Sequence, residues 1–165
     1  MERLAEAFRR TVAGCLLVLA SGVADAVPEW RLTDLQGRSI GPADFAGDWV
    51  VVNYWATWCK PCREEMPALD EIANRNDHVT VLGIAWEDTS TAALERFLDR
   101  FPVSYPILRA DPYDPPPNVE APRVLPMTLV FAPDGQLARR FHGPVSRGDI
   151  QSVVDGERSG TGGER

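Results

Sequence analysis

The sequence predicts an α/β fold in which a strand leads into a helix that begins with a pair of cysteines. An apolar run over residues 49–55, rich in β-branched and aromatic side chains, predicts a buried strand. A helical segment over 62–73 follows it, and a second strand (78–86) and an amphipathic helix (89–101) come next. This alternation of strand and helix favours a core of parallel strands.

The flanking segments predict hairpins at both ends of this core and a closing helix. The expected elements are an N-terminal hairpin over 30–35 and 38–40, a helical turn over 44–48, a second hairpin over 127–131 and 136–141, and a helix over 146–155. Residues 111–122 contain five prolines and predict an irregular loop inside the domain.

Cys59 and Cys62 are the residues best suited to a catalytic role, as a pair of reactive thiols. The free N–H groups at a helix N-terminus stabilise a thiolate, so the pKa of Cys59 is expected below the free value of about 8.5. Lys60 adds a cation that acts in the same direction, and Pro61 suits the first turn of a helix. We expect Cys59 to be the nucleophile and Cys62 the resolving thiol.

Zinc binding is the main competing use of such a pair. A structural zinc site needs four ligands. The only other cysteine is Cys15, and the two histidines, His78 and His142, lie far apart without ligand spacing. We therefore expect no metal site, while a non-reactive structural disulfide remains an alternative.

The N-terminus predicts export. Basic residues up to Arg10 precede an apolar run over 12–20 and a small-x-small site ending at Ala26, which is typical of a signal peptide over residues 1–26. An uncleaved anchor and a lipid attached to Cys15 are the alternatives. The expected location is the periplasm, with a domain over 27–157 and a flexible tail over 158–165.

The composition of the chain excludes some classes of binding partner. The formal net charge of −7 argues against nucleic acid and anionic membrane surfaces. Removing 26 of the 165 residues leaves 139, enough for one domain with a proper core. In an oxidising compartment, the remaining Cys59 and Cys62 stay reduced only if another protein supplies electrons.

Residues 52–67 (Val-Asn-Tyr-Trp-Ala-Thr-Trp-Cys-Lys-Pro-Cys-Arg-Glu-Glu-Met-Pro) resemble the signature of the exported TlpA/ResA-like branch of the thioredoxin superfamily. The segments 34–38, 125–128 and 134–135 follow in the expected order, and the resemblance extends from about Pro28 to Asp155. It implies a thioredoxin-like three-layer α/β sandwich with a mixed central sheet and an N-terminal β-hairpin extension.

The resemblance also implies further site residues. The Leu125-Pro126 bond is expected to be cis and to pack beside the dithiol, and Trp58 to cover one side of it. An acid near the active site is expected at Glu87, with Asp88 as the alternative, to exchange protons with Cys62. The aspartate that cytosolic thioredoxins bury beneath the dithiol is replaced here by Asn53. The residues expected to form the client-binding pocket are Trp58, Lys60, Pro61, Leu125 and Pro126.

The resemblance implies a monomeric thiol–disulfide oxidoreductase whose only redox group is the Cys59–Cys62 disulfide, with no other cofactor. Its clients would be cysteines of apocytochrome c or of copper sites, and a membrane thiol reductase would recharge it. A disulfide-forming oxidant and a non-enzymatic Cu(I) carrier are alternatives. The position of Thr57, two residues before Cys59, disfavours a peroxidase, and the two-residue cysteine spacing disfavours a copper site at His142.

Overall fold

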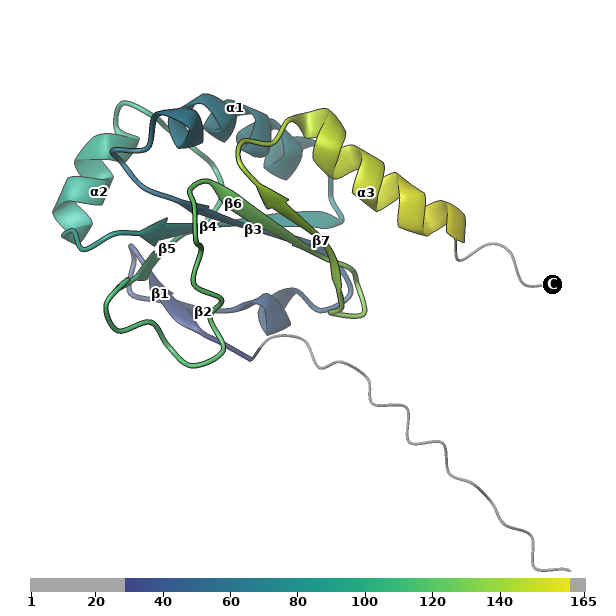
Figure 1. Cartoon of the computed structure of the whole chain (residues 1–165), viewed down its shortest axis with the longest axis horizontal. Coiled ribbons are helices and arrows are strands. Elements are labelled where there is room, and N and C mark those ends of the chain that lie inside the picture. The colour runs from purple at the N-terminus through teal and green to yellow at the C-terminus, as the bar shows by residue number, and fades with distance from the viewer. Residues whose placement is uncertain (1–28, 161–165) are drawn as a thin grey trace, which may run out of the picture.

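A computed structural model describes residues 29–160 (Figure 1). The predicted signal peptide over 1–26 and the last residues of the predicted tail, 161–165, lie outside the described residues. The elements are β1 (Leu32–Asp34), β2 (Ser39–Ile40), the 3₁₀ helix η1 (Pro42–Phe45), β3 (Trp49–Trp55), α1 (Lys60–Arg75), β4 (Val79–Trp86), α2 (Thr91–Leu98), β5 (Ile107–Ala110), β6 (Met127–Phe131), β7 (Leu137–His142) and α3 (Arg147–Gly160).

The sheet has seven strands in the order β2-β1-β5-β4-β3-β6-β7. Strands β3, β4 and β5 are parallel, and the remaining pairs are antiparallel, so the sheet is mixed. β1 and β2 form the expected N-terminal hairpin and extend the sheet beside β5. The predicted thioredoxin-like α/β fold is confirmed.

All three helices pack on one face of the sheet (Figure 1). Alternate residues of β3, among them Val51 and Trp55, join Leu69 of α1, Phe97 of α2 and Ile150 of α3 in one apolar cluster. Both cysteines belong to this cluster. The end of β3 that carries the dithiol is therefore fixed by packing from three helices.

Among residues 29–160, no α-helix covers the other face of the sheet. Val52 and Tyr54 of β3 point into a second apolar cluster, together with Val119 of the proline-rich loop and Phe45 of η1. Glu120 of the same loop is held to Arg140 of β7, with 2.7 Å between carboxylate and guanidinium. The proline-rich loop and η1 thus form the third layer.

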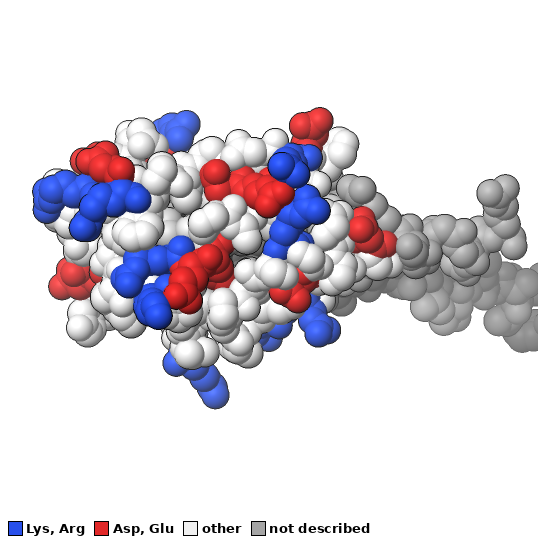
Figure 2. Space-filling model, turned by 90° about the horizontal axis from the view of Figure 1, so that it is seen from above, with Lys and Arg blue, Asp and Glu red and all other residues white. Residues whose placement is uncertain are grey.

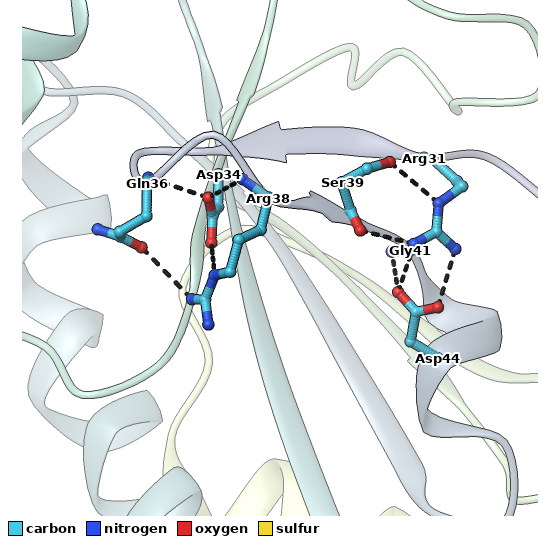
Figure 3. A network of polar contacts seen from close by, with 7 residues as sticks. All are labelled: Arg31, Asp34, Gln36, Arg38, Ser39, Gly41 and Asp44. Atoms are coloured by element: carbon cyan, nitrogen blue, oxygen red, sulfur yellow. Dashed lines mark hydrogen bonds and ion pairs between the residues drawn. The ribbon is translucent and has the colours of Figure 1, made fainter.

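Two polar clusters stabilise the N-terminal hairpin and join it to η1 (Figure 3). The Arg31 guanidinium donates to both carboxylate oxygens of Asp44, at 2.8 and 2.9 Å, and to the Ser39 hydroxyl. In the second cluster, the buried Asp34 carboxylate accepts from the backbone N–H groups of Gln36 and Arg38 and from the Arg38 side chain. These bonds fix the hairpin turn.

The observed limits of the helices and strands agree best with the predicted limits where the apolar sequence pattern is strongest. β3 and β6 have the predicted limits, whereas α1 begins two residues before the predicted helix and α2 is shorter than expected. β5 was not predicted, because its four residues follow Pro106 and include the exposed Arg109. α3 continues to Gly160, so residues 158–160, predicted as flexible tail, are helical.

Within residues 29–160, no helix is both long and apolar enough to span a bilayer.

Candidate active site

Cys59 and Cys62 lie where β3 passes into α1 and are joined by a disulfide, with 5.3 Å between their Cα atoms. Cys59 is the N-cap of α1, and its Sγ accepts a hydrogen bond from the Cys62 N–H at 3.3 Å. A negative charge on this sulfur is stabilised there by an otherwise unpaired helix N–H. Cys59 keeps 4% of its surface exposed, whereas Cys62 is fully buried, so of the two residues only Cys59 touches solvent.

Lys60 supports the thiolate less than the sequence suggests. Its ammonium group lies 3.5 Å from the Glu64 carboxylate, and the two side chains are 78% and 63% exposed. Solvent screens such a pair, and the neighbouring carboxylate offsets the positive charge near Cys59. Pro61 occupies the first turn of α1, as predicted. The helix N-terminus is therefore the main local stabiliser of a thiolate.

The Leu125-Pro126 bond is cis, as the resemblance implies. β6 begins at the next residue, Met127, which lies opposite Tyr54 of β3, so Pro126 is level with the end of β3. The Leu125 side chain packs against the cluster that contains both cysteines. No hydrogen bond joins the Leu125 main chain to another residue in the described part of the chain. The N–H and C=O groups of Leu125 are therefore without a main-chain partner among residues 29–160.

Glu65 is a buried acid that the sequence analysis did not single out. Its carboxyl group is held at both oxygens: the Asn53 side-chain amide donates to Oε1 at 2.7 Å, and the Val145 N–H donates to Oε2 at 2.8 Å. The same Asn53 amide also donates to the Thr128 hydroxyl at 3.0 Å. Only 3% of Glu65 is exposed. Burial raises its pKa to about 7, although the bonds from Val145 and Asn53 act in the opposite direction.

Helical spacing places this acid close to the resolving cysteine. Glu65 is three residues after Cys62, and both are buried on the same face of α1. Side chains at this spacing are neighbours, with about 5–6 Å between Cβ atoms. The sequence signal was an acidic residue in step with the apolar positions Cys62, Met66 and Leu69, where a buried helix face normally carries no charge.

Glu87, the acid expected from the resemblance, lies at the redox turn. Its half-buried carboxylate accepts from the Thr57 N–H at 2.7 Å and from the Thr57 hydroxyl at 3.0 Å. It therefore clamps the turn that precedes Cys59. Asp88, the alternative, is exposed. The deeply buried carboxyl group near Cys62 is that of Glu65.

The remaining candidates separate into surface and core positions. Trp58 is 68% exposed next to Cys59, whereas Trp55 is fully buried and stacks on Phe97. His142 is exposed on β7, where it pairs with Met127 of β6. Among residues 29–160, no three or more His, Cys, Asp or Glu side chains gather in a group able to hold a metal ion.

Comparisons with known proteins agree with this geometry. A family model described as the AhpC/TSA family matches residues 23–151. The thiol-disulfide oxidoreductase ResA of Geobacillus kaustophilus is 31% identical over 138 residues, which cover 82% of this chain and 78% of that protein.

Two solved structures resemble this chain in both fold and amino-acid sequence. A DsbF homologue from Corynebacterium diphtheriae is 33% identical, with a TM-score of 0.67, over 79% of this chain and 85% of that one. A secreted thiol-disulfide isomerase from Corynebacterium glutamicum is 29% identical, also with a TM-score of 0.67, over 77% and 81% of the two chains.

The raised pKa of Glu65 predicts a pH-dependent stability. The ordinary pKa is 4.5 and the folded value about 7, so the folded protein holds an extra proton between these values. The free energy of unfolding therefore falls as pH rises from about 4.5 to about 7, by about 3 kcal/mol at most, and this contribution is constant above pH 7. Glu65→Gln should remove this fall.

The measurement is urea unfolding of the oxidised protein, in which the disulfide-bonded cysteines do not titrate, between pH 4.5 and 8. Glu64→Gln, which changes the exposed neighbour, is the matched control and should keep the wild-type dependence. An equal fall in wild type and Glu65→Gln would contradict the assignment.

Proposed function

The chain belongs to the AhpC/TSA family and is a thiol–disulfide oxidoreductase of the ResA/DsbE type, and from this premise we propose that it reduces disulfides in client proteins outside the cytoplasm. The observation that carries the proposal is the division of roles within one helical turn. Cys59 is the accessible cap of α1, Cys62 is fully buried, and the titratable Glu65 follows one turn later.

The location rests on two observations. Residues 1–26 have the pattern of a signal peptide, and the similar Corynebacterium glutamicum protein is described as secreted. We place the domain in the periplasm, where client cysteines such as those of apocytochrome c or of copper-binding proteins become oxidised. A membrane thiol reductase is the proposed electron donor.

The reaction begins with the reduced pair. The Cys59 thiolate attacks one sulfur of a client disulfide; that S–S bond breaks, a Cys59–client disulfide forms, and the other client sulfur leaves as a thiolate. Cys62 then attacks the Cys59 sulfur and releases the second client thiolate. Two electrons pass to the client, and the product is the Cys59–Cys62 disulfide present in this structure. Two electrons from the donor restore the dithiol.

Glu65 supplies the acid–base group for the second step. The buried Cys62 thiol must lose its proton before it can attack, and no solvent reaches its side chain. With a pKa of about 7, the Glu65 carboxyl group is partly ionised at neutral pH and can accept this proton. Asn53 cannot exchange a proton, but its amide holds the carboxyl group in place.

Client binding is assigned to the exposed surface around Cys59. Trp58 precedes Cys59, and the exposed Val124 precedes the Leu125-Pro126 segment. An extended client segment can add to the free main chain of Leu125 in the manner of an extra strand. Apolar side chains beside the client cysteine would then contact Trp58 and Val124.

The first test is a covalent trap. Cys62→Ser lacks the resolving thiol, so a Cys59–client disulfide should accumulate with oxidised protein clients, whereas the wild-type complex is transient. Non-reducing electrophoresis and mass spectrometry check this result. Cys59→Ser is the control and should trap nothing, because Cys62 is buried. A correctly folded Cys62→Ser that forms no mixed disulfide would contradict the mechanism, and binding of Cu(I) without insulin reduction would favour the carrier alternative.

The second test concerns Glu65. Glu65→Gln should slow resolution of a mixed disulfide by about 10²-fold at pH 7, the lower range of general base catalysis. The wild-type resolution rate should rise with an apparent pKa near 7, and the variant should lose this inflection. Stopped-flow decay of a preformed mixed disulfide measures both effects, with Glu64→Gln as the control. Unchanged pH profiles would remove Glu65 from the mechanism.

The third test concerns the direction of electron flow. Because Glu64 offsets the charge of Lys60, the thiolate of the reduced form gains little extra stability. We therefore expect a reduction potential of about −250 mV. A disulfide-forming oxidant would have a potential of about −120 mV. Equilibration with glutathione and with dithiothreitol measures the value. A result near the second figure would reverse the proposed direction.

A further inference from the structure

A recess of about 390 Å³ opens beside the redox turn, between the start of α1 and α2. Trp58, Arg63 and Thr57 contribute from the turn and α1, and Phe97, Arg100 and Phe101 from α2 and the residues after it. Its volume lies in the lower part of the range of about 300–1,000 Å³ typical of ligand pockets. Trp58 makes the recess continuous with the surface next to Cys59.

Arg63 is held in a fixed position in this recess. Its guanidinium donates to the Thr57 carbonyl oxygen at 2.8 Å and lies 5.9 Å from the centre of the Phe101 ring. Phe101 in turn stacks on Phe97, with 4.7 Å between ring centres, and Phe97 stacks on the buried Trp55. The aromatic stack anchors the guanidinium, so little conformational entropy is lost when Arg63 binds an anion.

Arg100 supplies a second positive charge without a partner. It is exposed, and no side-chain hydrogen bond or ion pair joins it to any residue from 29 to 160. The lining residues include no carboxylate. Glu87 is the acid bonded to the recess wall, and both of its oxygens are engaged by Thr57. Two guanidinium groups and one engaged carboxylate leave a net positive charge at this site.

This local charge contrasts with the rest of the molecule. The formal net charge is −7, and charges of both signs cover the helix-bearing face; at the end where α2 lies, a group of Lys and Arg side chains adjoins Asp and Glu side chains (Figure 2). A guanidinium pair in an otherwise acidic protein attracts a carboxylate specifically to that point. A neutral or basic group gains no electrostatic attraction at this point.

We propose that the recess holds an acidic side chain of the client polypeptide, within a few residues of the client cysteine, with Arg100 and Arg63 as its charge partners. The inference rests on the proposed function, because the occupant is part of the chain that Cys59 attacks. The pair makes the enzyme selective for disulfides flanked by Asp or Glu. Arg100 and Arg63 are therefore specificity-determining residues, and the disulfide exchange itself does not require them.

The test uses synthetic cyclic peptides closed by one disulfide, with Glu, Gln or Lys at each of the three positions on either side of one cysteine. Quenched-flow chromatography gives second-order rate constants for their reduction by the reduced protein. At one or two positions, Glu peptides should react about three- to tenfold faster than Gln peptides in 0.01 M salt, and Lys peptides more slowly. In 1 M salt the preference should largely disappear.

Variants of Arg100 assign the effect to the recess. Arg100→Gln should reduce the Glu-to-Gln rate ratio below twofold, and Arg100→Glu should make the Lys peptide the faster substrate. Arg96→Gln, which removes an exposed charge from α2 outside the recess, is the matched control and should keep the wild-type ratio.

Three outcomes overturn the proposal: no peptide position at which wild type prefers Glu, a ratio that Arg100→Gln leaves unchanged, or an equal loss in Arg96→Gln. Failure of the proposed function looks different. In that case wild type reduces none of the peptides, neutral ones included, and the recess proposal falls with it. Reduction of Gln peptides without a preference for Glu overturns the recess alone.

Discussion

The buried contact between Glu65 and Asn53 is the constraint on which the redox site depends. Through it and the neighbouring bonds to Thr128 and Val145, one carboxyl group connects α1, β3, β6 and the segment before α3. These elements surround the dithiol: β3 and α1 carry the cysteines, and β6 follows the cis proline. A change of charge on Glu65 therefore alters hydrogen bonds that reach each of these elements.

Burial of the Glu65 carboxyl group is costly to stability and useful to chemistry for the same reason. Desolvation disfavours the ionised form of Glu65 and raises its pKa to about 7, and two hydrogen bonds only partly offset the effect. An ordinary carboxyl group of pKa 4.5 would hold no proton at neutral pH, whereas this one can accept and return a proton in the range where a thiol must ionise. The fold tolerates a buried acid at the position where the proposed mechanism uses it.

The sequence predicted most of what local patterns determine. The apolar run of β3 and the Cys59/Cys62 pair have short-range signatures, so both were located correctly, and the resemblance supplied the cis Leu125-Pro126 bond. β5 was missed because four residues carry too weak a pattern. Glu65 was missed because its burial depends on Asn53 and Val145, which are 12 and 80 residues away in the chain. The Arg63–Phe101 contact likewise exists only once the segment after α2 lies beside α1.

The identity of residue 53 follows from the position of the acid. An aspartate on β3 at this site would place a second carboxylate within hydrogen-bond distance of Glu65, since the Asn53 amide lies 2.7 Å from its Oε1. Two buried carboxylates so close cannot both ionise, and one of them would be forced to keep its proton. Asn53 avoids this conflict by donating to Glu65 and to Thr128 with the same amide nitrogen. In this chain the buried titratable group near Cys62 thus lies on the helix, and the strand residue is the donor that holds it in place.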